Sequence, residues 1–183
     1  MFLELLQKLG RALEGGAIPY MIIGGQAVLV YGEARLTKDI DITLGVFLDR
    51  LAEVLSLVTT LGLRVLVDPE EFTRRTLVLP CQDPLTGIRV DFIFSWSEYE
   101  QQALKRRRGL FLGEQIVYFA SLEDVLIHKV IAGRPRDLED VRRLLQKNPQ
   151  VDEAYLSRWL RWFDEALGAS YSAMLAKLSA SSS

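Results

Sequence analysis

Two adjacent glycines interrupt the longest nearly apolar stretch of the chain, Ala17 to Tyr31. The residues before them, 18–23, are short and apolar, which is typical of a buried strand. Gly24 and Gly25 then permit a tight turn, and residues 26–31 have the length and character of a short helix. The pattern predicts a strand, a glycine turn and a helix, which together favour an α/β fold.

A segment in which acidic and apolar residues alternate follows this unit, from Asp39 to Leu44. Successive side chains of a strand point to opposite faces, so Asp39 and Asp41 are expected on one face and Ile40 in the core. Two neighbouring carboxylates repel each other unless solvent or a cation relieves them, and their hard oxygen atoms suit Mg²⁺ or Mn²⁺. For this pair alone, a solvated face of an edge strand is the commoner explanation.

A third aspartate, Asp91, stands among β-branched and aromatic residues in the segment 88–94, against the usual composition of strands. It either marks an exposed strand face or completes a metal site and accepts the proton of an attacking hydroxyl. The Gly24-Gly25 turn likewise has two interpretations. It is simply a turn, or its backbone N–H groups at a helix start receive a phosphate.

Periodicity predicts the remaining elements of a mixed β-sheet flanked by helices. Helices are expected over residues 2–13, 48–61, 125–132, 135–146, 152–167 and 170–178. Strands are expected over residues 64–67, 75–79, 88–94 and 110–119, with a hairpin turn at 84–87. This order predicts a core over residues 1–120, a helical C-terminal part over 121–178 packed on it, and a flexible tail over 179–183.

Charge and cysteine content narrow the function classes. The 183 residues include 22 basic and 24 acidic side chains, and the net charge of −2 argues against charge-driven coating of nucleic acid or anionic membranes. The single cysteine, Cys81, cannot form an intramolecular disulfide, so a reducing cytoplasm is the expected compartment. The apolar stretch around the glycine pair is too short and too interrupted to span a bilayer, so no membrane partner is expected.

In combination, these motifs resemble the nucleotidyltransferase superfamily. The matching residues are Ile23-Gly24-Gly25, Asp39-Ile40-Asp41 and the later Asp91. The segments Gly24 to Ala27 and Arg35 to Asp41 resemble more narrowly the AbiEii/AbiGii group of minimal nucleotidyltransferases, many of which are toxins of toxin–antitoxin pairs. The downstream helical motif of that group is matched by Lys129, Arg134, Arg136-Asp137 and Asp140.

The resemblance implies a metal-dependent transfer of a nucleoside monophosphate from an NTP to a hydroxyl on RNA, such as tRNA, or on protein. It implies Mg²⁺ or Mn²⁺ as cofactor and a cognate antitoxin as a further partner. The implied catalytic residues are Asp39, Asp41, Asp91 and Lys129, of which the three aspartates are the metal ligands. The implied nucleotide-binding residues are Gly24, Gly25, Arg35, Thr37, Lys129 and Asp137.

Three alternatives remain open at this point. The protein could be a nucleotide-binding regulator or antitoxin-like interaction protein with little turnover. Lys129, Asp137 and Asp140 could be surface ion pairs, worth only about 0–1 kcal/mol each. A stripe of aromatic residues at Trp159, Trp162 and Phe163 is either helical core or a partner surface.

Overall fold

The computed structural model describes residues 2–33, 38–95 and 97–180 of the chain. It divides into two compact units. Unit 1 comprises residues 1–26 and 36–120, and unit 2 comprises residues 27–35 and 121–183.

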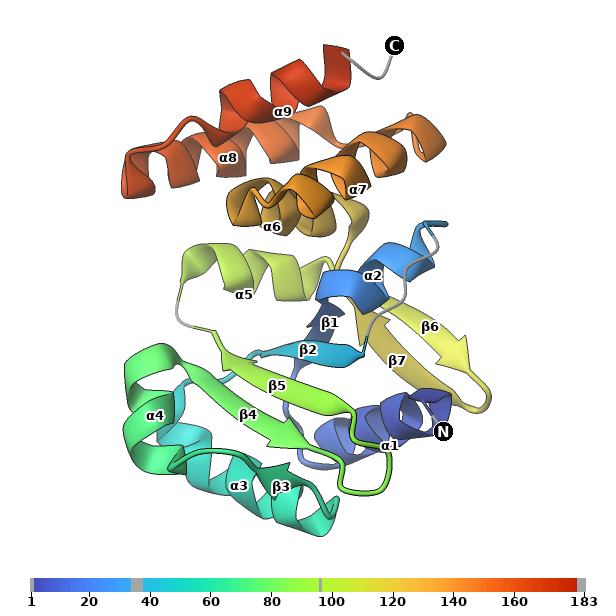
Figure 1. The fold of residues 1–183 in the computed structure, drawn as a ribbon, viewed down its shortest axis with the longest axis vertical. Helices are drawn as coiled ribbons and strands as arrows, with labels where there is room; N and C mark the ends of the chain where they lie inside the picture. Colours follow the sequence, from blue (N-terminus) through green and yellow to red (C-terminus); the bar gives the residue numbers. More distant parts are fainter. Residues whose placement is uncertain (1, 34–37, 96, 181–183) are drawn as a thin grey trace. The chain divides into compact units, whose positions relative to one another are not determined.

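Within the described residues, unit 1 contains a seven-stranded mixed sheet in the order β3-β4-β5-β2-β1-β7-β6 (Figure 1). The strands are β1 (Tyr20–Ile23), β2 (Asp39–Leu44), β3 (Arg64–Val65), β4 (Val78–Gln82), β5 (Arg89–Phe94), β6 (Arg108–Leu112) and β7 (Gln115–Phe119). Strand β2 runs parallel to β5 and β1 runs parallel to β7, whereas the other neighbours are antiparallel. This sheet confirms the predicted mixed α/β class.

The helical elements of unit 1 are α1 (Phe2–Gly15), η1 (Leu48–Arg50), α3 (Leu51–Thr60), α4 (Pro69–Thr76) and α5 (Glu98–Lys105). Helix α2 (Gly24–Val30) begins in unit 1 and ends in unit 2. Helix α1 approaches the sheet closely at Gly10, where an added Cβ would lie 2.8 Å from Tyr20 Oη and 3.2 Å from Val117. Tyr20 and Ile22 are both buried, and they project from the same face because side chains alternate along β1. One face of the sheet is therefore the apolar core face that α1 covers.

The prediction of a strand over residues 75–79 is wrong in its first half, because Arg75 and Thr76 end helix α4. This helix has strong local start signals. The Asp68 side chain accepts a hydrogen bond from the Glu71 backbone N–H, and Pro69 occupies the first turn. The helix stops at Leu77, which adopts a left-handed backbone with φ of 61°, and β4 starts one residue later.

The strand expected over residues 64–67 is limited to Arg64–Val65, and the helix expected over residues 26–31 begins already at Gly24. Several other predicted elements are confirmed. Strand β2 has the predicted bounds, and β4 pairs antiparallel with β5 across the turn at 84–87. The helix expected over residues 48–61 is present as η1 followed by α3.

Unit 2 is helical, with α6 (Leu122–Ala132), α7 (Pro135–Lys147), α8 (Glu153–Leu167) and α9 (Tyr171–Ala180). The Ser121 side chain caps α6 by accepting a hydrogen bond from the Asp124 backbone N–H. Trp159 is 2% exposed and belongs to the core of this unit, whereas Trp162 and Phe163 are half-buried beside it. Two residues of the predicted flexible tail, Ser179 and Ala180, are helical, and residues 181–183 lie outside the described part of the chain.

Across the described residues, no helix combines the length and the apolar character that a membrane span requires.

Candidate functional site

The parallel pairing of β2 with β5 sets the positions of the three predicted carboxylates. Asp41 lies directly beside Asp91 in this pairing, and Asp39 lies directly beside Arg89. The two strands are far apart in sequence, and the register between them brings Asp91 to the other aspartates.

Burial shows that these side chains share one face of the sheet. Ile40, Ile42, Val90 and Phe92 alternate with the charged residues and are 0% exposed. Ile42 pairs with Ile22, which lies on the face that α1 covers. Because side chains alternate along a strand, Asp39, Asp41 and Asp91 project from the opposite face. We call these three residues the acidic face.

Gly24 brings the backbone against the acidic face. It directly follows β1, whose last residue, Ile23, pairs with Asp41. Gly24 has φ of +65°, and a Cβ added to it would lie 2.3 Å from Asp41 Oδ2. Only glycine fits here without strain, since both the backbone angle and the close approach exclude a larger residue. The glycine turn is thus adapted to the carboxylate beside it.

A basic side chain also belongs to this face. Arg89 Nε donates a hydrogen bond to Asp91 Oδ1 at 2.8 Å, and the side chains of Arg89 and Asp91 are 50% and 18% exposed. This hydrogen bond, aided by the negative charges of Asp91, Asp39 and Asp41, raises the pKa of Arg89. The three carboxylates and this guanidinium therefore form one electrostatic group.

The acidic face fits a hard divalent cation in residue type. Three carboxylates lie on one face, and two of them, Asp41 and Asp91, are direct neighbours on adjacent strands. Their side chains are not yet arranged as a complete ligand set. No group of three or more His, Cys, Asp or Glu in the described part of the chain is positioned to hold a metal ion. Binding one through Asp91 Oδ1 would require the hydrogen bond from Arg89 to be broken.

Two predicted nucleotide-binding residues, Arg35 and Thr37, lie outside the described residues. Gly25 follows Gly24 in the first turn of α2. The nucleotide contacts of all these residues stay predictions.

In unit 2, Lys129 lies in a buried ion-pair cluster. Its Nζ is 2.6 Å from Asp137 Oδ1 and 2.9 Å from Asp140 Oδ2, and these side chains are 6%, 1% and 9% exposed. Burial alone would raise the pKa of Asp137, but hydrogen bonds from Lys129 and Arg134 outweigh it and lower this pKa. The alternative of a surface ion pair is therefore wrong in its placement: the charges meet, but they meet in the interior. The predicted contact of Lys129 with a nucleotide stays a prediction.

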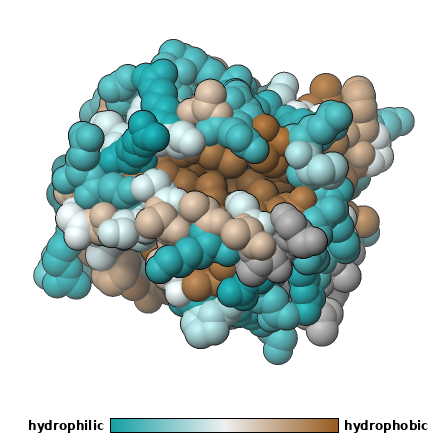
Figure 2. Space-filling view, turned by 90° about the horizontal axis from the view of Figure 1, so that it is seen from above, coloured by the Kyte–Doolittle hydropathy of each residue, from teal (hydrophilic) through white to brown (hydrophobic). Residues whose placement is uncertain are grey.

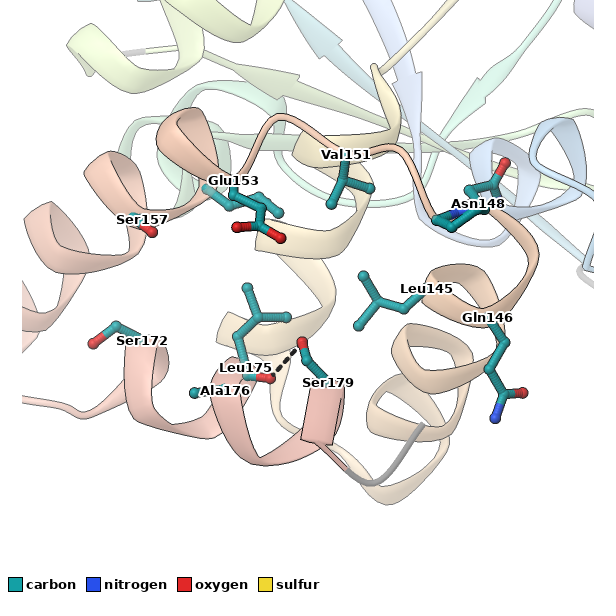
Figure 3. A pocket seen from close by; sticks show the side chains of 12 residues that line it. Leu145, Gln146, Asn148, Val151, Glu153, Ser157, Ser172, Leu175, Ala176 and Ser179 are labelled. Carbon is teal, nitrogen blue, oxygen red and sulfur yellow. Dashed lines mark hydrogen bonds between the residues drawn. The ribbon is translucent and has the colours of Figure 1, made fainter. Parts of the chain in front are cut away.

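Unit 2 also contains a separate cavity of about 540 Å³ between α7, α8 and α9 (Figure 3). Leu145, Val151, Leu156 and Leu175 give it an apolar lining, and Glu153 is its charged residue. The face of the molecule seen in Figure 2 has a hydrophobic hollow bordered by hydrophilic residues. The residues recorded around the cavity include none of the predicted catalytic or nucleotide-binding residues.

Comparison with known proteins decides the family. Residues 9–178 match the family described as "Nucleotidyl transferase AbiEii toxin, Type IV TA system". The chain belongs to this family. It is therefore an AbiEii-family nucleotidyltransferase, as the sequence motifs predict. A search of curated proteins finds no match.

Solved structures share the fold of this AbiEii-family chain at low identity. ANT(2")-Ia in complex with adenylyl-2"-tobramycin has a TM-score of 0.60 and 16% identity, and the match covers 99% of this chain and 98% of that one. An antigenic nucleotidyltransferase-like protein from Paracoccidioides brasiliensis has a TM-score of 0.58 and 18% identity. The match covers 95% of this chain and 91% of that one. The lincosamide antibiotic adenylyltransferase LnuA, lincomycin-bound, has a TM-score of 0.56 and 16% identity. The match covers 77% of this chain and 94% of that one. These likenesses confirm the nucleotidyltransferase fold.

Sequence reasoning missed Arg89 as part of the site of this AbiEii-family protein. The signal was available, because Arg89 precedes Asp91 by two positions in a strand and must project from the same face. A motif of metal ligands does not include it, because a guanidinium does not coordinate metal ions.

Proposed function

We propose that the acidic face transfers a nucleoside monophosphate from an NTP to a hydroxyl group of an RNA, such as a tRNA, or of a protein, with the help of Mg²⁺ or Mn²⁺. The observation that carries this proposal is the parallel register that sets Asp91 directly beside Asp41, on the same face as Asp39. The family match supports the class of reaction.

In the proposed reaction, the oxygen of the acceptor hydroxyl forms a bond to the α-phosphorus of the NTP. The bond from that phosphorus to the oxygen bridging to the β-phosphorus breaks, and pyrophosphate leaves in line. Asp91 would accept the proton of the hydroxyl, a role that its position beside Asp41 supports. The new bond to the acceptor oxygen replaces the bond to pyrophosphate, and the proton of the hydroxyl passes to the Asp91 carboxylate.

Asp39, Asp41 and Asp91 would hold the divalent cation, which neutralises charge on the triphosphate and on the leaving pyrophosphate. Gly24 lies against Asp41 Oδ2, and the absence of a Cβ there leaves room for this carboxylate. Gly24 and Gly25 would let the phosphates approach the main chain closely, since neither has a side chain. Arg35, Thr37, Lys129 and Asp137 are proposed to bind or orient the nucleotide.

The test is incubation of the purified chain with each labelled NTP, Mg²⁺ or Mn²⁺, and either total RNA or the protein itself. We expect label to appear in one acceptor and pyrophosphate to be released in equal amount. Asp41→Asn should abolish the transfer and leave the fold intact. Asp49→Asn, at an exposed position on η1, is the matched control and should transfer like the wild type.

Nucleotide binding without transfer, at every NTP and acceptor combination, would contradict the proposal and favour the alternative of a regulator. Transfer that survives Asp41→Asn would place the reaction elsewhere in the molecule.

We also propose that the protein acts in the cytoplasm as the toxin of a toxin–antitoxin pair, which the family description supports. Induced expression should arrest growth with the wild type and not with Asp41→Asn. Co-expression of a neighbouring small gene should restore growth if that gene encodes the antitoxin.

A further inference from the structure

A single strand supplies both a proposed metal ligand and a competing positive charge. Arg89 and Asp91 are two positions apart in β5 and project from the same face, and Arg89 lies directly beside Asp39 of the neighbouring strand. Its Nε donates to Asp91 Oδ1 at 2.8 Å. The guanidinium therefore engages the carboxylate that is proposed to bind metal and to accept the proton.

The charges of the acidic face explain why a cation belongs there. Three carboxylates on neighbouring positions of two strands repel one another, and this repulsion opposes folding unless a positive charge offsets it. Arg89 supplies that charge from within the chain, and the carboxylates of Asp91, Asp39 and Asp41 all act on it.

The difference in exposure indicates which partner can move. The Arg89 side chain is 50% exposed, whereas that of Asp91 is 18% exposed. The long arginine side chain can swing toward solvent, while Asp91 stays fixed between the neighbouring strands β2 and β4. Releasing Asp91 thus requires movement of Arg89 and no change in the sheet.

We propose that Arg89 is a built-in counter-ion of the acidic face, and that a divalent cation must displace it from Asp91 to complete the metal site. The inference rests on the proposed function, since it assumes that the acidic face binds the metal. Arg89 then has two opposite effects. It stabilises the metal-free protein, and it weakens the affinity for the cation that replaces it.

The experiment measures Mn²⁺ binding to the full chain without nucleotide, by the electron paramagnetic resonance signal of free Mn²⁺. Arg89→Gln should bind Mn²⁺ about tenfold more tightly than the wild type, equivalent to about 1.4 kcal/mol. Arg64→Gln is the matched control, because Arg64 lies in the same sheet but donates to the neutral Gln82. It should bind like the wild type, and Asp41→Asn should abolish binding in both backgrounds.

A second readout needs no metal. In EDTA at low salt, Arg89→Gln should melt at a lower temperature than the wild type, and 1 M salt should narrow the gap because it screens the carboxylates. Arg89→Lys keeps the positive charge and should restore both the melting temperature and the Mn²⁺ affinity to near the wild-type values. It also provides a folded comparison if Arg89→Gln is poorly stable.

The outcomes separate the inference from the proposed function. If the wild type binds Mn²⁺ through Asp41 but Arg89→Gln binds it equally or more weakly, the counter-ion inference is overturned and the proposed function stands. If neither protein binds Mn²⁺, the metal-dependent function fails and the displacement fails with it. Equal melting temperatures of Arg89→Gln and the wild type in EDTA at low salt would also overturn the counter-ion role.

Discussion

Replacement of Gly24 by alanine should disturb the acidic face much more than it lowers the stability of the fold. The backbone at Gly24 has φ of +65°, a conformation that costs a non-glycine residue about 1–2 kcal/mol. The new Cβ would lie 2.3 Å from Asp41 Oδ2, so the carboxylate must move by about 1 Å to reach an ordinary contact distance. Because Asp41 Oδ2 ends a short side chain that can rotate, we expect the protein to fold, with about 1–2 kcal/mol lost.

The effect on function should be much larger than the effect on folding. A displacement of about 1 Å in a reacting group typically costs about 100-fold in rate. Gly24→Ala should therefore lower nucleotide transfer by about 100-fold and weaken Mn²⁺ binding, while urea unfolding shows only the modest loss of stability.

Gly62→Ala is the matched control for backbone strain. Gly62 has φ of +72° and no atom within 4 Å of an added Cβ, so it carries the conformational cost without the contact. It should lose a similar free energy of unfolding and keep full transfer and Mn²⁺ affinity. The reasoning would be refuted if Gly24→Ala retained wild-type transfer and Mn²⁺ affinity, or if both variants lost them equally.

Three further predictions concern buried groups. Lys129→Met leaves the buried Asp137 and Asp140 without the lysine that they share. It should lower the free energy of unfolding, measured in urea, by about 3–5 kcal/mol. Lys177→Met, at an exposed position, is the control and should change this free energy by less than about 0.5 kcal/mol. The pKa of Asp137 is lower in the folded protein than in the unfolded chain, so its stabilisation is present above about pH 4 and should be lost as the pH falls further, measured by thermal melting from pH 6 to 2. Burial, and secondarily the charge of Asp91, raises the pKa of the Cys81 thiol to about 12. This thiol should therefore react with a thiol reagent at pH 8 only as fast as the protein unfolds locally. Rapid stoichiometric labelling of the folded protein would contradict this.

The sequence predicts the centre of the sheet well because alternation there is strict. Strand β2 agrees with its predicted bounds since Asp39 and Asp41 alternate with isoleucines that have one buried face to fill. Helix α4 was missed because the residues around Arg75 suit a strand as well as a helix. The helical conformation of Arg75 is determined by the residues upstream, because Asp68 and Pro69 start a helix that ends at Thr76.

The candidate site shows a different limit. Alternation assigns each aspartate to a face of its own strand, but the neighbour of Asp41 depends on strand order and register, which are long-range properties of the sheet. Lys129 illustrates the same point in unit 2. Helical spacing puts Asp137 and Asp140 on one face, yet only tertiary packing shows that this face is buried against the lysine.

The crossover between β2 and β5 has a consequence for the timing of synthesis. On the ribosome, Asp39 and Asp41 are made well before Asp91, and η1, α3, β3, α4 and β4 come between them. A nascent chain that has not yet produced β5 therefore carries only two of the three carboxylates of the acidic face. Because parallel pairing of distant segments is slow to form, Asp91 would join the other two carboxylates only after the whole crossover has folded. The acidic face is thus complete only once the chain has been made through Phe94 and β5 has joined the sheet.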